Sequence, residues 1–189
     1  MGAMMRKLIV SMHISINGLI SGPNGEMDWL LAGVEESLPG IEKFFLSVDT
    51  MIMGRVTYEG LSQYWPPLSD RFADWVNKTP KIVISRAPFE VKWGKWETIR
   101  LIHENVRDEI KKMKQDAGRN MVIVGGANLV QSFTNLGLID EYRLVVDHVI
   151  LPGRNMFLEN IEKPHNLELI DMKRYEKGTV VLHYRAKND

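Results

Sequence analysis

Apolar and polar residues alternate strictly from Val10 to Asn17. A period of two predicts a strand with one buried face and one polar face. Gly18 and the segment SGPNGE at 21–26 then predict a turn-rich loop, which leads into Asp28 and Trp29. The first predicted strand is therefore followed by a loop that carries polar and aromatic candidates for binding.

A different spacing follows this loop. Four apolar residues recur three and four positions apart, with Pro39 near the start of the series: Ile41, Phe44, Phe45 and Val48. Because positions three and four apart share one face of a helix, this spacing predicts a helix that faces the core.

Short apolar runs alternate with helical patterns in the middle of the chain. The runs that predict strands lie at 50–54, 81–85, 97–102 and 121–124. Helices are predicted at 55–61, at 70–78, at 105–117 and from 127 onward, the last with Leu129, Val130, Phe133 and Leu136 on one face.

The last third of the chain predicts strands at 142–151, 167–174 and 179–186, the final two joined by a YEKG hairpin turn. Alternating strands and helices that end in a hairpin predict an α/β fold. We expect a single domain with a mixed, mainly parallel sheet flanked by helices and an antiparallel C-terminal hairpin. We interpret MGAM at 1–4 as an expression remnant and expect the domain to occupy 5–187.

The composition excludes several classes of protein. Lysine plus arginine and aspartate plus glutamate both total 24 in 189 residues, so no overall basic field attracts nucleic acid or an anionic membrane. There is no cysteine, which excludes disulfides and thiolate chemistry. The five histidines show no metal-ligand spacing, so we expect no metal. No apolar run is long enough to span a bilayer and no signal peptide is evident, so we expect a cytoplasmic protein.

Three predicted strand ends carry residues suited to binding an anion. In open α/β sheets, ligands bind beyond the carboxyl ends of the strands, so these three ends can face one crevice. Their residues are Gly54, Arg55 and Thr57; Ser85 and Arg86; and Gly125, Gly126, Ala127 and Asn128.

Arg55 lies at a predicted helix N-terminus, where the helix dipole disfavours a cation unless an anion lies between them. The free backbone N–H groups at that helix start and the Thr57 hydroxyl suit a phosphate oxygen, and Arg86 can add a second guanidinium. The alternative is that both arginines are solvated surface residues and Thr57 is a helix cap. The local sequence leaves both interpretations open.

The Gly125–Gly126 pair is equally ambiguous. Without Cβ atoms it can admit a pyrophosphate at the start of the following helix, or it can form a tight corner with positive φ. The full Gly-x-Gly-x-x-Gly fingerprint and a Walker-type motif are both missing, which disfavours a standard dinucleotide fold and a nucleoside-triphosphate hydrolase.

No catalytic acid stands out. The carboxylates considered for proton transfer are Asp28, Glu35, Glu36 and Asp49, and none has a partner visible in the sequence. A Gly-x-Ser-x-Gly elbow is absent, which disfavours a serine hydrolase.

Four segments together carry a resemblance over almost the whole chain: SING at 15–18, MGRVTYEGL at 53–61, VISR at 83–86 and the run from VGGANL to LPG at 124–153. The sequence resembles the dihydrofolate-reductase-like superfamily. It is most similar to the reductase domain that forms the C-terminal half of the riboflavin-pathway deaminase-reductase, and to the stand-alone relatives of that domain.

The resemblance implies an NADPH-dependent reductase that forms a homodimer. It implies that Arg55, Thr57, Ser85 and Arg86 hold the adenosine 2′-phosphate end of the cofactor. The segment from Gly125 to Leu129 is implied to hold the pyrophosphate and the nicotinamide ribose, with Asn17, Asp28 and Trp29 on the substrate or nicotinamide side.

The sequence departs from the family pattern at two positions. Asn17 replaces an aspartate in the first turn, and Val124 replaces an acidic residue before the glycine pair. These departures leave three expectations open: a reductase of the 5-amino-6-(5-phosphoribosylamino)uracil type, a dihydrofolate reductase, or a non-catalytic NADP-binding or regulatory protein.

Overall fold

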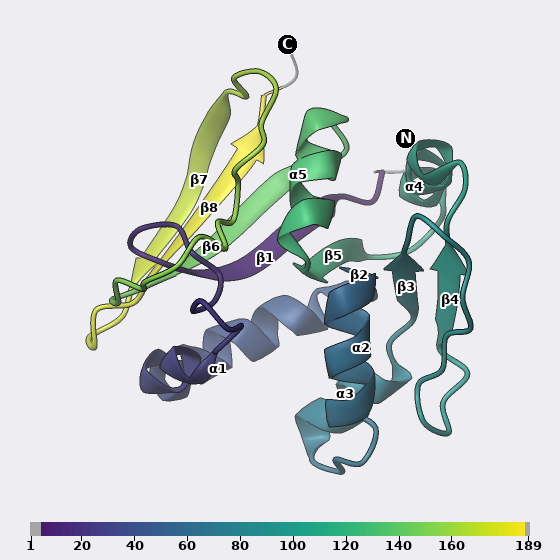
Figure 1. The fold of residues 1–189 in the computed structure, drawn as a ribbon, viewed down its shortest axis with the longest axis horizontal. Coiled ribbons are helices and arrows are strands. Elements are labelled where there is room, and N and C mark those ends of the chain that lie inside the picture. Colours follow the sequence, from purple (N-terminus) through teal and green to yellow (C-terminus); the bar gives the residue numbers. More distant parts are fainter. Residues whose placement is uncertain (1–4, 188–189) are drawn as a thin grey trace.

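A single eight-stranded sheet forms the centre of the protein. The computed structural model describes residues 5–187, with only the backbone described for 31–38. The strands, in chain order, are β1 (Leu8–Ser15), β2 (Val48–Gly54), β3 (Lys81–Ile84), β4 (Ile99–Ile102), β5 (Asn120–Gly125), β6 (Glu141–Asp147), β7 (Leu167–Arg174) and β8 (Val180–Ala186). They lie side by side in the order β4-β3-β2-β5-β1-β6-β8-β7 (Figure 1).

The sheet is parallel from β4 to β6 and antiparallel at its other end. Each neighbouring pair from β4 through β6 runs parallel, whereas β8 runs antiparallel to both β6 and β7. The predicted YEKG turn joins β7 to β8, with the Tyr175 N–H donating to the Thr179 carbonyl at 2.9 Å. The predicted mixed sheet with a C-terminal hairpin is therefore confirmed.

Helices cover both faces of this sheet. They are η1 (Asp28–Leu30), α1 (Leu31–Leu46), α2 (Arg55–Tyr64), α3 (Arg71–Lys78), α4 (Val106–Gln115) and α5 (Ala127–Asn135). Side chains of α4 and α5 pack in one buried apolar cluster, and side chains of α1, α2 and α3 pack in a second cluster. The domain is thus a three-layered α/β sandwich with the sheet in the middle.

Some element boundaries differ from the sequence prediction. Strand β1 starts at Leu8, two residues before the alternating pattern begins at Val10. Leu8 pairs with Met121 of the neighbouring strand β5. Because a central parallel strand is buried on both faces, alternation of apolar and polar residues does not mark the start of β1. Helix α1 starts at Leu31, so Pro39 lies inside the helix and not near its start. Leu136 lies just beyond α5 and is partly exposed, because the helix ends at Asn135.

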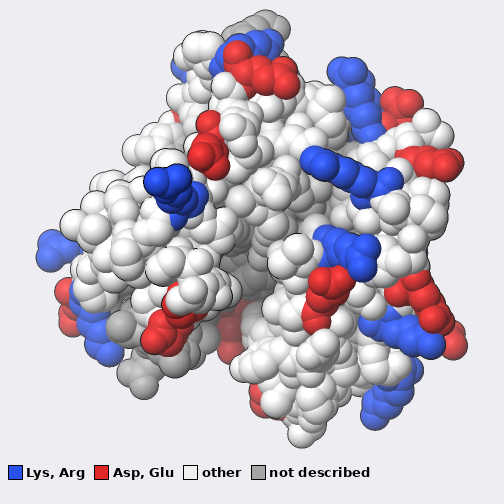
Figure 2. All heavy atoms as spheres, viewed as in Figure 1, with Lys and Arg blue, Asp and Glu red and all other residues white. Residues whose placement is uncertain are grey.

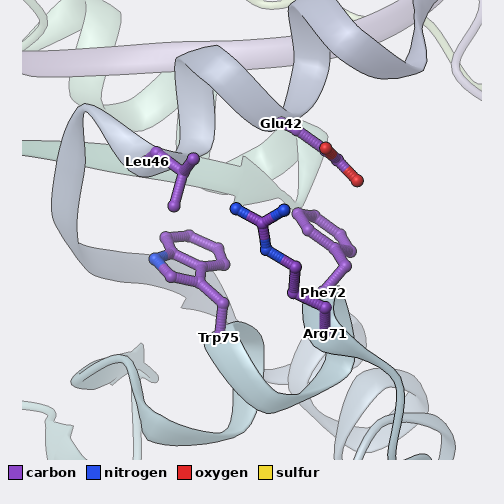
Figure 3. A pocket seen from close by; sticks show the side chains of 5 residues that line it. All are labelled: Glu42, Leu46, Arg71, Phe72 and Trp75. Atoms are coloured by element: carbon purple, nitrogen blue, oxygen red, sulfur yellow. The ribbon is translucent and has the colours of Figure 1, made fainter.

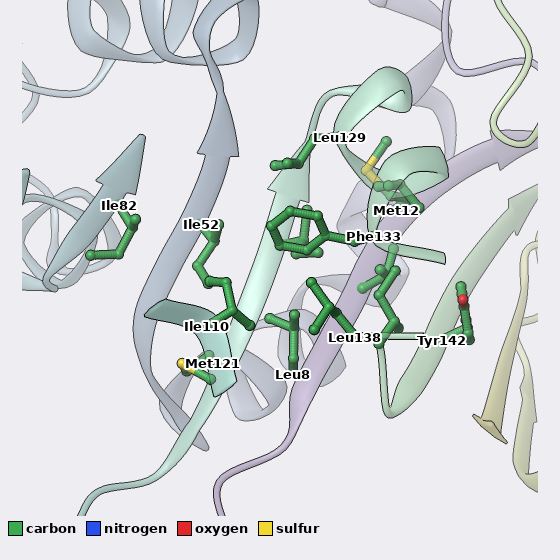
Figure 4. Packing of buried hydrophobic residues seen from close by; sticks show 14 of the residues in the cluster. Leu8, Met12, Ile52, Ile82, Ile110, Met121, Leu129, Phe133, Leu138 and Tyr142 are labelled. Atoms are coloured by element: carbon green, nitrogen blue, oxygen red, sulfur yellow. The ribbon is translucent and has the colours of Figure 1, made fainter. Parts of the chain in front are cut away.

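The larger apolar cluster lies between the sheet and helices α4 and α5 (Figure 4). Phe133 from α5 and Ile110 from α4 are buried against Leu8 of β1 and Ile123 of β5. Full burial of a side chain of this size contributes about 1.5–3 kcal/mol relative to exposure. The central strands and these two helices are therefore fixed to one another by the same set of contacts.

The second cluster contains a buried lysine among aromatic rings. Lys81 is 1% exposed, and its ammonium lies 4.6 Å from the centroid of the Trp93 ring. Lys81 Nζ donates to the carbonyl oxygens of Asn77 and Thr79, and the Trp93 indole N–H donates to Asn77 Oδ1 at 2.8 Å. Burial lowers the pKa of Lys81 to about 7. These acceptors and the ring face compensate for the lost hydration of the ammonium.

Glu141 forms a buried ionic contact at the start of β6. Its carboxylate accepts hydrogen bonds from His183 Nε2 at 2.9 Å and from Lys7 Nζ at 2.6 Å. The hydrogen bond from His183, followed by the contact with Lys7, lowers the pKa of Glu141 to about 2, against the opposing effect of burial. The three residues connect β1, β6 and β8 across the join between the parallel and antiparallel parts of the sheet.

We predict that this contact stabilises the fold at neutral pH and is lost in acid. Because the pKa of Glu141 falls from its ordinary value of 4.5 to about 2, its contribution is fully present above pH 4.5. The contribution then declines as the pH falls toward 2, and it amounts to about 3 kcal/mol. Urea unfolding of the wild type and of Glu141→Gln should give a stability difference that is largest near neutral pH and shrinks below pH 4.5.

Glu168→Gln is the matched control, because Glu168 is a half-exposed carboxylate paired with Arg185 at 3.5 Å on the neighbouring strand. We expect this change to alter the unfolding free energy by less than about 1 kcal/mol. A difference in unfolding free energy between the wild type and Glu141→Gln that stays constant from pH 7 to pH 3 would contradict a lowered pKa for Glu141.

Candidate functional site

The ends of three neighbouring strands form the candidate site. Strands β3, β2 and β5 lie side by side, and Met53 near the end of β2 pairs with Gly125 at the end of β5. Helix α2 begins directly after β2, and helix α5 begins directly after β5. Neither helix has a side-chain cap, since their N-cap residues are Gly54 and Gly126. Two helix N-termini with unpaired backbone N–H groups therefore lie together at one edge of the sheet.

These two helix starts are in close contact. A Cβ atom on Gly125 would lie 2.7 Å from Thr57 Cγ2 and 2.8 Å from Thr57 Oγ1. Gly126 has a φ of 95°, and a Cβ there would lie 3.6 Å from the Gly54 Cα and N atoms. The glycine pair thus forms a corner with positive φ at a close approach of two backbones, as the second of the two interpretations predicts. Pyrophosphate binding by this segment stays a prediction.

Arg55 has two partners that orient it. Its Nε donates to Glu59 Oε1 at 2.8 Å one helical turn along, and its guanidinium lies 4.6 Å from the centroid of the Phe89 ring. About half of each side chain in the Arg55–Glu59 pair is exposed. Because Nε carries the contact with Glu59 and one face of the guanidinium covers Phe89, the terminal amino groups remain available to an anion.

The other predicted phosphate-side residues lie at the same edge. In the part of the chain that the structure describes, the Thr57 hydroxyl has no hydrogen-bond partner and Arg86 has no ion pair. Ser85 donates its N–H to the Ile102 carbonyl at 3.2 Å, and its side-chain oxygen accepts from Ala87 at 3.3 Å. The structure thus brings the predicted cationic and hydroxyl groups together and leaves Thr57 and Arg86 unengaged.

Asn17 lies beyond the end of β1 and is tied to the loop after β6. Its Nδ2 donates to the Leu151 carbonyl at 2.8 Å, while its Oδ1 accepts from the Leu151 N–H at 3.1 Å and from the Ser15 hydroxyl at 2.8 Å. This side chain therefore fixes two loops to each other, a role that the sequence did not indicate.

Asp28 and Trp29 lie in the short helix η1 on the loop after β1. Asp28 is exposed, and its carboxylate accepts from the Trp29 N–H at 3.1 Å. The Trp29 indole N–H donates to the Glu26 carbonyl at 3.2 Å, which holds the ring against its own loop. The loop therefore presents an exposed carboxylate beside a fixed, partly buried indole ring.

The remaining proton-transfer candidates are not placed at this edge by the structure. Asp49 lies at the start of β2, the opposite edge from Gly54, and it accepts hydrogen bonds from Arg6 and from the Arg119 N–H. Glu35 and Glu36 fall within 31–38, outside the residues whose side chains are described. The position of Asp49 near the amino end of β2 places it away from the carboxyl ends of the strands.

Sequence reasoning missed Glu59 and Phe89. Glu59 could have been found, since it lies four residues after Arg55 on a predicted helix and such pairs contact each other. Phe89 gave no such signal, because it approaches Arg55 only through the packing of the loop after β3. Val124, the other departure from the family pattern, packs against the second apolar cluster, which explains an apolar residue there.

Two of the five histidines are hydrogen-bonded to carboxylates. His13 Nδ1 lies 2.8 Å from Asp147 Oδ2, and His183 contacts Glu141. His148 follows the end of β6 and is exposed. Among residues 5–30 and 39–187, no group of three or more histidine, aspartate or glutamate side chains is placed to hold a metal ion.

Two cavities lie away from this edge. The first, of about 40 Å³, lies between α1 and α3, where the Arg71 guanidinium extends between the Phe72 and Trp75 rings toward Leu46 (Figure 3). It has room for a few water molecules only. The second, of about 280 Å³, is lined by Arg6, Lys7, Lys114 and Arg185, each of which already pairs with a carboxylate.

A broader hollow lies at the candidate site. Figure 2 shows the molecular surface hollowed between α2 and the loops that follow β1 and β6. The carboxyl ends of β2, β5, β1 and β6 are neighbours in the sheet, so this hollow extends along one continuous edge. A ligand that spans this edge would contact both the helix starts and the loops around Trp29.

Residues 6–181 match the RibD C-terminal domain family. The chain belongs to this family. It is 30% identical to YyaP of Bacillus subtilis (strain 168) over 185 residues, covering 95% of this chain and 94% of that protein. It is also 30% identical to YwjB of the same organism over 183 residues, covering 96% and 98%.

Solved structures agree with the fold. A protein provisionally assigned to riboflavin biosynthesis, from Shewanella sp. PV-4, superposes with a TM-score of 0.78 at 21% identity, over 96% of this chain and 99% of that chain. Dihydrofolate reductase from Enterococcus faecalis, complexed with NADP(H), gives a TM-score of 0.59 at 21% identity, over 96% and 97%. The RibD C-terminal family member is thus a dihydrofolate-reductase-like domain and an oxidoreductase of the riboflavin-biosynthesis type. None of its described helices has the length and apolarity needed to cross a membrane.

We predict that the contact between Gly125 and Thr57 requires glycine. Gly125→Ala places a methyl group within 2.7 Å of Thr57 Cγ2, so we expect a loss of about 1–3 kcal/mol in the free energy of unfolding. The second-site change Thr57→Ala removes the clashing atoms and should restore most of that loss. Urea denaturation of the two single variants and the double variant measures this coupling.

Gly60→Ala is the control, because Gly60 lies on α2 with no atom within 4 Å of the added methyl group. This change should leave the protein equally stable or slightly more stable. If Gly125→Ala destabilises the protein no more than Gly60→Ala does, the two segments do not approach each other in solution as the structure places them.

Proposed function

We propose that the protein is an NADPH-dependent reductase that transfers hydride to a carbonyl or imine carbon of a small heterocyclic substrate. The observation that supports this most directly is the contact between two uncapped helix N-termini at the ends of β2 and β5. Backbone N–H groups and helix dipoles favour anions at such a place, and the missing Cβ atoms allow the two helix starts to lie next to each other. A dinucleotide supplies phosphate groups of the required charge.

The residues at this edge fit the two ends of the cofactor. Arg55, Thr57, Ser85 and Arg86 would hold the 2′-phosphate of the adenosine, and the segment Gly125–Leu129 would hold the pyrophosphate and the nicotinamide ribose. Two arginines at one edge favour NADPH over NADH, since the additional 2′-phosphate of NADPH supplies negative charge that compensates these cations.

The bound cofactor supplies the hydride, and the protein supplies position and surroundings. The helix starts orient the phosphates, and the corner at Gly126 allows the dinucleotide to approach the backbone. Asn17 holds the loop after β1 against Leu151, which fixes the wall opposite α2. Asp28 and Glu26 are exposed carboxylates on that loop, and either can relay a proton from water to the substrate.

The family and its structural relatives suggest the reaction class. A deaminase/5-amino-6-(5-phosphoribosylamino)uracil reductase from Thermotoga maritima superposes with a TM-score of 0.68 at 11% identity, and this chain covers 57% of that protein. The corresponding reductase reaction is our first candidate. Reduction of dihydrofolate is a second, and NADP binding without catalysis is a third. A substrate panel separates them, because only the third gives tight NADPH binding with no oxidation of NADPH.

We predict that Arg55→Ala weakens NADPH and leaves NADH almost unchanged. In our proposal Arg55 contacts the 2′-phosphate, which NADPH has and NADH lacks. The variant should therefore lose about 1–3 kcal/mol of binding free energy for NADPH. Tryptophan fluorescence titrations with NADPH and NADH in parallel measure both dissociation constants.

Arg100→Ala provides the matched control. Arg100 is about as exposed as Arg55 and also pairs with a glutamate, Glu109, but it lies on β4 away from the helix starts. We expect this variant to bind both cofactors as the wild type does. An equal loss of NADPH and NADH affinity in Arg55→Ala would refute 2′-phosphate recognition, and no binding of either cofactor to the wild type would refute the proposed function.

We also propose that the protein is a homodimer that pairs through the surface of β7. This strand is the outer edge of the sheet, and Leu169 and Met172 on it are exposed. Met172 lies opposite Leu182, which lies opposite Leu144 on the same face, so the apolar face of the core continues outward to the edge. An apolar edge strand of this kind needs cover.

Light scattering at micromolar concentration should therefore give twice the monomer mass for the wild type. The double change Leu169→Lys and Met172→Lys places two charges in the apolar surface, and we expect it to give the monomer mass. Asp171→Asn is the control, because Asp171 faces the other side of the same strand, opposite His183. A monomeric wild type would refute this proposal.

A further inference from the structure

The two sides of the hollow differ in charge. The side formed by α2 and the end of β3 carries Arg55 and Arg86. The other side is formed by the loops after β1 and β6. The sequence contains no lysine or arginine between Lys7 and Lys43, and none between Arg143 and Arg154. Apart from Arg154 and Lys163, which lie further along the loop after β6, the cations of these segments thus lie on the side that we assign to the cofactor phosphates.

The loop after β1 carries carboxylates in place of cations. Glu26 accepts a hydrogen bond from the Asn24 N–H at 2.8 Å and another from Asn24 Nδ2 at 2.6 Å. Hydrogen bonds from its own backbone and from Asn24 lower the pKa of Glu26, so it is ionised at neutral pH. Asp28 is exposed two residues further along the same loop.

The same side exposes large apolar side chains. Ile16 is 62% exposed and Ile150 is 72% exposed, and their segments lie side by side because the Ile16 N–H donates to the Val149 carbonyl at 2.9 Å. Met27, between Glu26 and Asp28, is 54% exposed. Isoleucine and methionine side chains bind apolar surface and offer nothing to a phosphate group.

The surface view agrees with this separation. In Figure 2 the described lysine and arginine atoms lie on the rim of the hollow and not inside it, and acidic atoms are visible at its lower edge. A phosphate ester bound on the side of the loops would meet Glu26 and Asp28 without a compensating cation. Like charges brought together in this way reduce affinity and exclude a ligand.

We propose that the substrate of this reductase carries no phosphate or other anionic group, and that it is a small neutral or cationic ring compound with apolar surface. This inference rests on the proposed function and narrows it. It argues against the first candidate reaction, because the substrate of that reaction carries a ribose 5′-phosphate. The ring would contact Trp29 and the exposed Ile16 and Ile150, and the carboxylates of the loop would tolerate positive charge.

Arg154 is the one residue that could oppose this assignment. It is exposed and lies on the loop after β6, whose next residue, Asn155, donates to the Ser21 hydroxyl at 2.6 Å. A phosphate substrate would have to be bound by this arginine. Substitution of Arg154 therefore distinguishes the two possibilities.

The test compares ligands of the same ring system with and without an anionic substituent. The first pair, 5-amino-6-(ribosylamino)uracil and its 5′-phosphate, differs only in the phosphate. The second pair is dihydrobiopterin and dihydrofolate, in which a p-aminobenzoylglutamate tail with two carboxylates replaces a neutral side chain. Calorimetry of the full chain in saturating NADP⁺ gives the four dissociation constants. We expect each neutral member to bind at least about tenfold more tightly than its anionic partner, because the anion meets fixed negative charge.

Variants identify the cause of this preference. The double change Glu26→Gln and Asp28→Asn should reduce the ratio of anionic to neutral dissociation constants by about three- to tenfold, because only the anionic ligands bind more tightly. Arg154→Ala should change none of the four dissociation constants by more than about twofold. Glu109→Gln on α4 removes a partly exposed carboxylate far from the hollow and should have no effect.

Three results would overturn the proposal. They are tighter binding of the phosphorylated nucleoside than of the free one, a selective loss of its affinity in Arg154→Ala, and failure of both neutral ligands to bind at millimolar concentration. NADPH titration without substrate tests the proposed function separately. Normal NADPH binding together with tighter binding of the phosphorylated nucleoside would refute this inference and leave the proposed function standing.

Discussion

The candidate site depends on a steric constraint at the ends of two neighbouring parallel strands. Strands β2 and β5 each continue directly into a helix, and the two helix starts lie so close that a Cβ atom at Gly125 would lie 2.7 Å from Thr57, while Gly126 has a φ of 95°. Only backbone without Cβ atoms allows this approach. The approach aligns two helix dipoles on one place and leaves their N–H groups without side-chain caps. The positive potential of the site thus comes from backbone groups together with Arg55 and Arg86.

The fold was largely predictable from the sequence because most elements carry local signals. Alternation and short apolar runs marked all eight strands, and Asp70 marked the start of α3, where its carboxylate accepts from the N–H groups of Phe72 and Ala73. The errors occurred where a local signal had a second meaning. Pro39 favours the first turn of a helix but lies inside α1.

The site was predictable only in part. The three strand ends converge as the general rule for α/β sheets predicts, because their positions follow from strand order alone. The contacts of individual side chains depend on residues far away in the chain. Asn17 bonds to Leu151, which is 134 positions distant, and the ring of Phe89 reaches Arg55 from another loop. No periodicity or motif in the sequence contains that information.

The aromatic residues are unevenly distributed over the molecule, and this has an optical consequence. Trp65, Trp75, Trp93 and Trp96 all pack in the cluster beneath α1, α2 and α3, whereas Trp29 lies on the loop after β1. The emission of the four clustered indoles reports the integrity of that layer. Trp29 lies on a loop that borders the hollow, so the wild type carries separate intrinsic reporters for unfolding of that layer and for occupancy of the hollow.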